Sequence, residues 1–190
     1  MQKMQKHSLE IVPFYLVCDV SSSMSAEDMQ TVDEGIVGLL DEINADPIFD
    51  AKVRISIVTY ADNAEVLVPM TTDNGFTHLR HVTIQSGAAQ FGNLFRFMKF
   101  LLARDCRSLA KSHSAVSRPL IFHISKGRPG DEGWLCYFER LMADDFIFRP
   151  NIVSYGVRAL RKMCSQASPA GVGRKRSFGL WPTTELARVP

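Results

Sequence analysis

The chain has 190 residues, of which 46% are hydrophobic and 22% are charged, and its formal net charge at pH 7 is +2. This length and composition are typical of one soluble globular domain and argue against a disordered chain. No apolar run approaches the roughly 18 to 20 residues that a membrane-spanning helix needs. The first ten residues, MQKMQKHSLE, are polar and have no secretion-signal character, so we expect a cytoplasmic protein that contacts no membrane.

The charge is spread unevenly along the chain. Residues 158–190 have a net charge of +6, which leaves −4 for residues 1–157. Beyond Pro169 the sequence mixes glycine, proline, serine and basic residues without hydrophobic periodicity, and such a composition is typical of a tail. We therefore predict one domain over residues 1–168 and a basic, flexible C-terminal tail over residues 169–190.

The first half of the chain predicts a strand, a helix and a β-hairpin, in that order. Residues 11–18 are apolar almost throughout, which is typical of a strand covered on both faces. Ser25 and Asp28 have the spacing of a capping box, and apolar residues then recur at helical intervals. Residues 53–60 and 64–70 follow as strands separated by a short turn, so we expect them to pair in antiparallel orientation.

The second half alternates helices and strands. Helices are predicted over residues 92–103, 134–142 and 159–167, and apolar runs predict strands over residues 120–124 and 152–157. This order predicts a three-layer α/β sandwich of Rossmann-like type, in which a mostly parallel sheet with one antiparallel edge strand carries helices on both faces. Ligands bind at the carboxyl ends of the strands in such folds.

A polar motif lies at one of these strand ends. In the segment CDVSSSM, Asp19, Ser21 and Ser23 alternate directly after the first predicted strand, and their oxygens are of the hard type that Mg²⁺ prefers. This DxSxS pattern between a buried strand and a capped helix resembles the von Willebrand factor A (vWA) domain. VRISIVTYADNAEVLVPMT resembles the second and third strands of that fold, and RPLIFHISKGRPGDEGW resembles a later strand and loop. The resemblance covers about residues 10–165 and is strongest to the TerY-type group of tellurium-resistance proteins.

The resemblance implies a metal-ion-dependent adhesion site (MIDAS), but only part of its ligand set is present. Asp19, Ser21 and Ser23 match the family pattern. Ala89 stands where the family has a threonine ligand, and Lys126 stands where it has an aspartate. A lysine about 4 Å from Mg²⁺ would repel it by roughly 4 kcal/mol per unit charge at an effective dielectric near 20. We therefore expect a degenerate MIDAS and no cofactor, with Mg²⁺ as the alternative.

The sequence leaves two arrangements open for the lysine. Our hypothesis is that Lys126 forms a salt bridge with Asp19 and replaces the metal with its own charge. Alternatively, Lys126 points to solvent and Asp19 is hydrogen-bonded to nearby backbone.

The function that this resemblance implies is that of a non-enzymatic protein-binding scaffold in a bacterial stress or tellurium-resistance system. We expect another protein as the partner, held through an acidic side chain. The partner-binding face is expected at the carboxyl edge of the sheet, and its candidate residues are Ser22, Ser25, Ala89, Gln90, Lys126 and Arg128. Nucleic acid is not an expected partner, because the single basic triplet at residues 174–176 is too little to indicate one.

Two other functions remain as alternatives. One is a Mg²⁺-binding vWA adhesion module with a reduced MIDAS, and the other is a metal-dependent, phosphatase-like hydrolase that uses Asp19. The sequence contains neither a GxSxG elbow nor a phosphate-binding P-loop. His123 lies within an apolar run and is interpreted as a hydrogen-bonded core residue. Asp131 and Glu132 are expected to stabilise the amino end of the helix over residues 134–142.

Overall fold

A computed structural model of the protein describes residues 10–70, 82–112, 115–126 and 128–157. The helix predicted over residues 159–167, the end of the predicted domain and the predicted tail lie outside the described residues.

The described residues form an α/β sandwich around one mixed sheet, with the strand order β3-β2-β1-β5-β6. β1 pairs in parallel with β2 and β5, and β5 pairs in parallel with β6, whereas β2 and β3 are antiparallel. The short β4 pairs with the first residues of β1. This topology confirms the predicted fold. The strands are β1 (Glu10–Asp19), β2 (Val53–Tyr60), β3 (Ala64–Val68), β4 (Ala115–Val116), β5 (Leu120–Ser125) and β6 (Asn151–Gly156).

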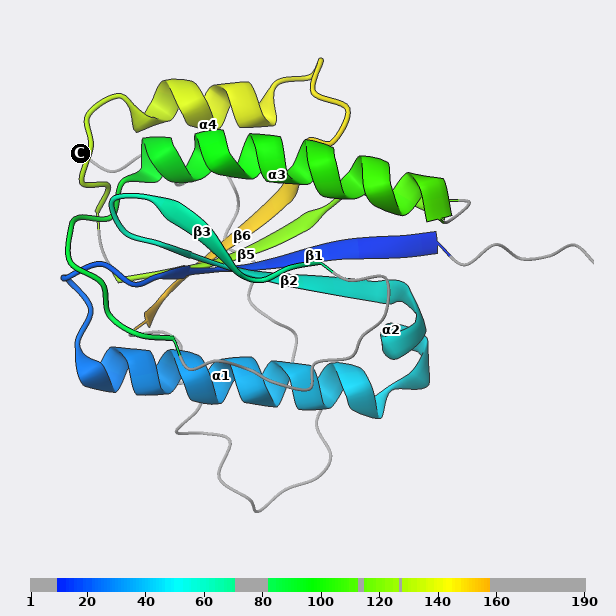
Figure 1. Ribbon diagram of the computed structural model, residues 1–190, viewed down its shortest axis with the longest axis horizontal. Coiled ribbons are helices and arrows are strands. Elements are labelled where there is room, and N and C mark those ends of the chain that lie inside the picture. The colour runs from blue at the N-terminus through cyan, green and yellow to red at the C-terminus, as the bar shows by residue number, and fades with distance from the viewer. Residues whose placement is uncertain (1–9, 71–81, 113–114, 127, 158–190) are drawn as a thin grey trace, which may run out of the picture.

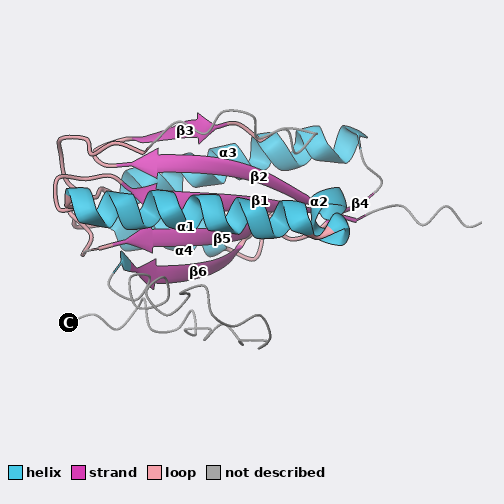
Figure 2. Ribbon diagram, turned by 90° about the horizontal axis from the view of Figure 1, so that it is seen from below, coloured by secondary structure: helices cyan, strands magenta, loops and turns pink. Residues whose placement is uncertain are grey.

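Helices cover both faces of the sheet. α1 (Ala26–Ala45) lies on one face, and α3 (Phe91–Ser112) and α4 (Trp134–Met142) lie on the other (Figure 1). The arrowheads of β1, β2, β5 and β6 point to one edge of the sheet (Figure 2), so the loops that follow these strands gather there. None of the helices in the described ranges combines the length and apolar character needed to cross a membrane.

The apolar run of β1 is continuous because both sides of this central strand are buried. Leu16 and Cys18 belong to the core cluster on the α1 side, together with Ile36. Tyr15 and Val17 belong to the cluster on the side of α3 and α4. Alternate side chains of a strand point to opposite faces, and each fully buried leucine or valine contributes roughly 1.5 to 3 kcal/mol to stability.

Two details of the helices differ from the sequence prediction. A short helix, α2 (Pro47–Lys52), begins at Pro47, where proline fits because a first-turn amide needs no helical acceptor. α3 runs nine residues beyond the predicted end at residue 103, across a pair of charged residues. This pair is accommodated because Asp105 is buried, accepts a hydrogen bond of 3.2 Å from the Tyr15 hydroxyl and pairs with Arg104.

Candidate functional site

Asp19 is the last residue of β1, and its carboxylate is held by the protein on both oxygens. The residue is fully buried. Its Oδ1 accepts a hydrogen bond of 2.9 Å from the Ser21 amide, and its Oδ2 accepts one of 2.8 Å from Ser125 Oγ. Ser125 ends the neighbouring strand β5, so the parallel pairing of β1 and β5 brings the two residues together. Sequence reasoning missed Ser125, although its place directly before Lys126 at a strand end is a usable signal.

Ser21 and Ser23 lie beside each other, as the alternating motif predicts. Their Oγ atoms are 2.9 Å apart and share a hydrogen bond in which either can be the donor. Two neighbouring ligands of an octahedral Mg²⁺ site with bonds near 2.1 Å would lie about 3 Å apart. The spacing of these two hydroxyl groups is therefore compatible with a metal.

The salt bridge predicted between Lys126 and Asp19 is replaced in the structure by one with Asp28. Lys126 Nζ lies 2.8 Å from Asp28 Oδ2. Asp28 lies at the amino end of α1, and the same oxygen, Oδ2, also accepts hydrogen bonds from the amide and the hydroxyl group of Ser25. The prediction was correct that the lysine lies at this edge and wrong about its partner.

Asp28 combines two tasks at the start of α1. It forms the predicted capping box, because Ser25 Oγ accepts from the Asp28 amide and the Ser25 amide donates to Asp28 Oδ2. Burial disfavours its charge, but the hydrogen bonds from Lys126 and Ser25 outweigh that effect and hold the pKa of the carboxyl well below its usual value. The carboxylate is therefore ionised at neutral pH and fixes the lysine next to the DxSxS loop.

The loop before α3 is joined to the DxSxS loop by backbone contacts. The Gly87 carbonyl accepts hydrogen bonds from both the Ser22 amide, at 3.0 Å, and Ser22 Oγ, at 2.9 Å. Gly87 has a φ of +109°, and a Cβ atom at this position would come within 2.2 Å of Asp62 Oδ2. The junction therefore requires glycine for two independent reasons, the backbone conformation and the close approach.

Asp131 ties the loop after β5 to the start of α3, which corrects the prediction that it serves the helix over residues 134–142. Its two carboxylate oxygens accept hydrogen bonds of 2.8 Å from the amides of Phe91 and Gly92. A carboxylate is favourable at this position because the first amides of a helix have no partner within the helix. The N-cap residue of α4 is Gly133, so no side chain caps this helix.

The candidate contact residues at this edge differ in accessibility. Ser22, Ser25, Lys126 and Arg128 are exposed and Gln90 is half-buried. Ala89 is only 6% exposed and packs in the core cluster with Phe91, so its side chain does not belong to an accessible surface.

A buried polar chain lies beneath the edge. As predicted, His123 is a core residue, 5% exposed. Its Nε2 lies 2.7 Å from the Tyr60 hydroxyl, and its Nδ1 lies 3.1 Å from Ser154 Oγ. Burial lowers the pKa of His123 to about 4, although the charge of Asp19 acts in the opposite direction. The imidazole is therefore neutral at physiological pH.

The donor set as a whole is poor for a divalent cation. Two hydroxyl groups have a suitable spacing, but the carboxylate of Asp19 is engaged on both oxygens, and a buried methyl and a paired ammonium stand at the other two expected ligand positions. Within the described ranges, no three His, Cys, Asp or Glu side chains are grouped so that they could hold a metal ion.

Comparison with known proteins places this arrangement in a wider context. Residues 14–127 match the family model described as the von Willebrand factor type A domain. Proximal thread matrix protein 1 from the mussel byssus is similar in structure, with a TM-score of 0.55 and 11% identity, over 78% of this chain and 38% of that one. An aerotolerance-related membrane protein from Bacteroides fragilis NCTC 9343 has a TM-score of 0.53 and 17% identity, over 76% and 67% of the two chains.

A third solved structure is the vWF domain of the type V pili tip protein Mfa5 from Porphyromonas gingivalis, with 20% identity and a TM-score of 0.43 over 64% of this chain. This chain spans 39% of the length of the Mfa5 chain and 38% of that of the thread protein. No curated protein matches the chain.

Proposed function

Because the chain belongs to the von Willebrand factor type A domain family, we propose that it is a non-enzymatic protein-binding module whose MIDAS-like edge works without a metal ion. The observation that carries this proposal is the ion pair between Lys126 and Asp28, at 2.8 Å, at the same edge as the Asp19 carboxylate, which accepts a hydrogen bond from the protein on each oxygen. The lysine and the hydrogen bonds hold the loops in place, which in the family is a task that a cation can share.

The mechanism of binding would be direct charge recognition. The Lys126 side chain is 34% exposed, and Arg128 is exposed two residues further along the loop. An acidic side chain of a partner could therefore contact a cation of the protein where a vWA relative presents a metal. Exposed charge contacts of this kind contribute about 0 to 1 kcal/mol each, so such an edge provides specificity and orientation more than affinity.

The cellular setting is proposed from resemblance alone. The likeness to TerY-type proteins suggests a scaffold in a bacterial stress or tellurium-resistance system in the cytoplasm. A hydrolase that uses Asp19 as a nucleophile is disfavoured, because both oxygens of this buried carboxylate already accept hydrogen bonds.

The spacing of the serine hydroxyls favours one alternative, a Mg²⁺-binding adhesion module with a reduced MIDAS. Ser21 Oγ and Ser23 Oγ are 2.9 Å apart, as neighbouring Mg²⁺ ligands would be, and Asp19 could bind an ion through water. In that case, partner binding would depend on Mg²⁺, whereas the metal-free module would bind equally well in a chelator.

Charge reversal at Arg128 tests the proposed edge. Arg128→Glu is expected to weaken partner binding about threefold to tenfold, because a rim cation becomes an anion facing an acidic group. The measurement is surface plasmon resonance with a partner identified by crosslinking at the edge.

Arg118→Glu is the matched control, because Arg118 is also exposed but precedes β5, at the opposite edge of the sheet. Equal binding by Arg128→Glu and Arg118→Glu would contradict the proposed location of the contact.

A further inference from the structure

The two outer layers of the sandwich carry opposite charges. The sequence of α1 contains six acidic residues and no basic residue. That of α3 contains five basic residues and one acid, the buried Asp105. Because α1 and α3 lie on opposite faces of the sheet (Figure 1), the part of the molecule that the structure describes is electrically polarised across the sandwich.

Exposed acids recur on one side of α1 at intervals of seven residues, which is close to two helical turns. Glu27, Glu34 and Asp41 are all exposed, and Gln30 and Val37 lie on the same side between them. With a rise of about 1.5 Å per residue, the row from Glu27 to Asp41 is about 21 Å long. We call these five residues the acidic ridge.

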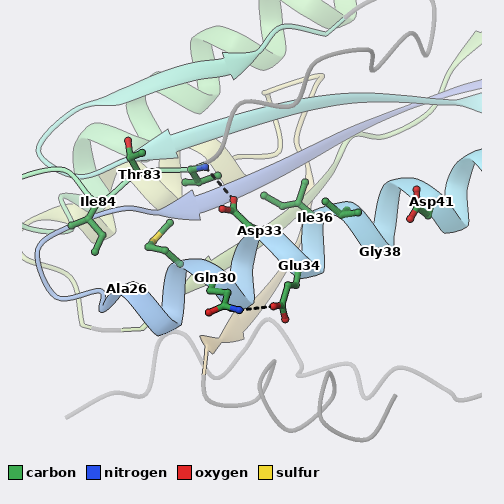
Figure 3. A pocket seen from close by; sticks show the side chains of 12 residues that line it. Ala26, Gln30, Asp33, Glu34, Ile36, Gly38, Asp41, Thr83 and Ile84 are labelled. Atoms are coloured by element: carbon green, nitrogen blue, oxygen red, sulfur yellow. Dashed lines mark hydrogen bonds between the residues drawn. The ribbon is translucent and has the colours of Figure 1, made fainter. Parts of the chain in front are cut away.

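A groove of about 840 Å³ runs along the acidic ridge, between α1 and residues 82–84 (Figure 3). Its lining includes two exposed apolar side chains, Val37 at 50% and Ile84 at 44%. Gly38 also lines it, and a Cβ atom built on Gly38 would meet no atom within 4 Å. The groove therefore offers apolar surface and open space next to a row of acids.

The opposite face carries a complementary row on α3. Arg96, Phe100, Arg104, Arg107 and Lys111 are all exposed and follow one another at helical spacing on one side of the helix. Phe100 is 67% exposed and stands within this row of cations. The row is about 22 Å long at 1.5 Å per residue. We call these five residues the basic ridge.

We propose that the protein self-associates head to tail, with the basic ridge of one copy packed antiparallel along the acidic ridge of the next copy. The two ridges have nearly equal lengths, and the antiparallel register brings Asp41 near Arg96, and Glu27 near Lys111. The same register places Phe100 over Gly38, in the groove. A parallel register would instead place Phe100 near the polar side chains of Gln30 and Thr31, further along the groove from Val37 and Gly38. The apolar contact therefore selects the antiparallel direction, and the charges select the partner face.

The geometry of this contact sets the form of the assembly. It joins two different surfaces on opposite faces of the molecule, so it is heterologous and leaves one ridge unused at each end of a stack. Copies therefore add one after another, without stopping at a dimer. Two helices in contact bury less surface than the roughly 1,200 to 2,000 Å² of stable interfaces, so the association is expected to be weak. Because the contact depends on exposed charges, it is also expected to be sensitive to salt.

Sedimentation velocity of the full chain over a concentration series tests the proposal. At an ionic strength of about 0.02 M, the average molecular mass is expected to rise continuously with protein concentration. At about 0.5 M salt, the protein is expected to be monomeric. Two charge-reversal variants, Glu34→Lys with Asp41→Lys and Arg96→Glu with Lys111→Glu, should each remain monomeric, as each then presents like charges across the contact. Their equimolar mixture should form a 1:1 dimer and nothing larger, since it restores a single native interface.

Control variants separate this contact from general charge effects. Glu132→Lys with Asp145→Lys changes the net charge as much as the α1 variant does, at exposed positions outside both ridges, and should associate as the unmodified protein does. Phe100→Ser changes no charge and should weaken association at least threefold. A monomeric unmodified protein at low salt, a limiting dimer, or association that survives either ridge variant with its circular dichroism unchanged would overturn the proposal.

Discussion

Asp131→Ala is expected to lower the free energy of unfolding by about 2 to 4 kcal/mol, because it leaves two buried amides at the start of α3 without an acceptor. These amides, of Phe91 and Gly92, each donate to the Asp131 carboxylate at 2.8 Å. The negative charge of the carboxylate also interacts favourably with the positive amino end of the helix dipole. Urea denaturation of both proteins measures the difference, and Asp131→Asn, which keeps a single carbonyl acceptor, should lose about half as much.

A glycine substitution provides an independent check on the same contact. A Cβ atom at Gly92 would lie 2.5 Å from Asp131 Oδ2, so Gly92→Ala should displace the carboxylate and destabilise the protein. Gly35→Ala in α1 is the matched control, because its Cβ would meet no atom within 4 Å and alanine usually stabilises a helix interior by about 0.5 to 1 kcal/mol relative to glycine. If both substitutions were stabilising, the role of Asp131 as the cap of α3 would be wrong.

The stability of the protein is expected to fall by roughly 3 kcal/mol between pH 6.5 and pH 4, because of His123. Burial lowers the pKa of this residue to about 4 in the folded protein, from an ordinary value of 6.5. Between pH 6.5 and pH 4 His123 is therefore protonated in the unfolded chain but remains neutral in the folded protein. The stabilisation that comes from the neutral His123 is fully present above pH 6.5 and is lost as the pH falls toward 4. At still lower pH, His123 makes no further change to the stability.

Urea titrations at several pH values test this assignment. His123→Gln cannot titrate but can still hydrogen-bond to the Tyr60 hydroxyl, so its stability should be lower at pH 7 yet much flatter between pH 6.5 and 4. Asp28 affects the stability in a separate, lower pH range. Because its pKa is lowered in the folded protein, the stabilisation that it gives is lost only as the pH falls below 3.8, the ordinary pKa of an aspartate. An unchanged slope above pH 4 in His123→Gln would show that other groups cause the acid sensitivity.

Local patterns in the sequence were sufficient to predict most of the fold. β2 and α4 have the predicted bounds, residues 53–60 and 134–142: a turn follows the apolar residues of β2, and a glycine precedes the amphipathic sequence of α4. The capping box at Ser25 and Asp28 was predictable because both of its partners lie within four residues. β4 was not predictable, since this strand has only two residues and exists through its pairing with β1.

The candidate site was predictable in position but not in its pairings. Parallel strands end at the same edge, so Asp19 and Lys126 were expected to lie close together. Which groups bond to each other depends on how three loops pack, and the partners are far apart in sequence. Ser125 donates to Asp19 from 106 residues away, and Lys126 pairs with Asp28 from 98 residues away. No local pattern specifies such contacts.

These pairings support one physical account of the edge. The three loops are linked by Ser22 to Gly87, by Asp131 to the start of α3 and by Lys126 to Asp28. The protein thus supplies the charge and hydrogen bonds that hold the edge together. We propose that a binding surface organised in this way requires no ion before a partner binds.

The most direct test of this account is the melting temperature of the unmodified protein as a function of Mg²⁺ concentration, with a chelator as the reference. We expect no change up to about 10 mM, because the edge has too few free ligands for this ion. A site with a dissociation constant near 1 mM would add about 1.4 kcal/mol at that concentration and raise the melting temperature by about 3 to 5 °C. A saturable rise of that size, absent from a variant with both Ser21→Ala and Ser23→Ala, would contradict the proposal that the edge works without a metal.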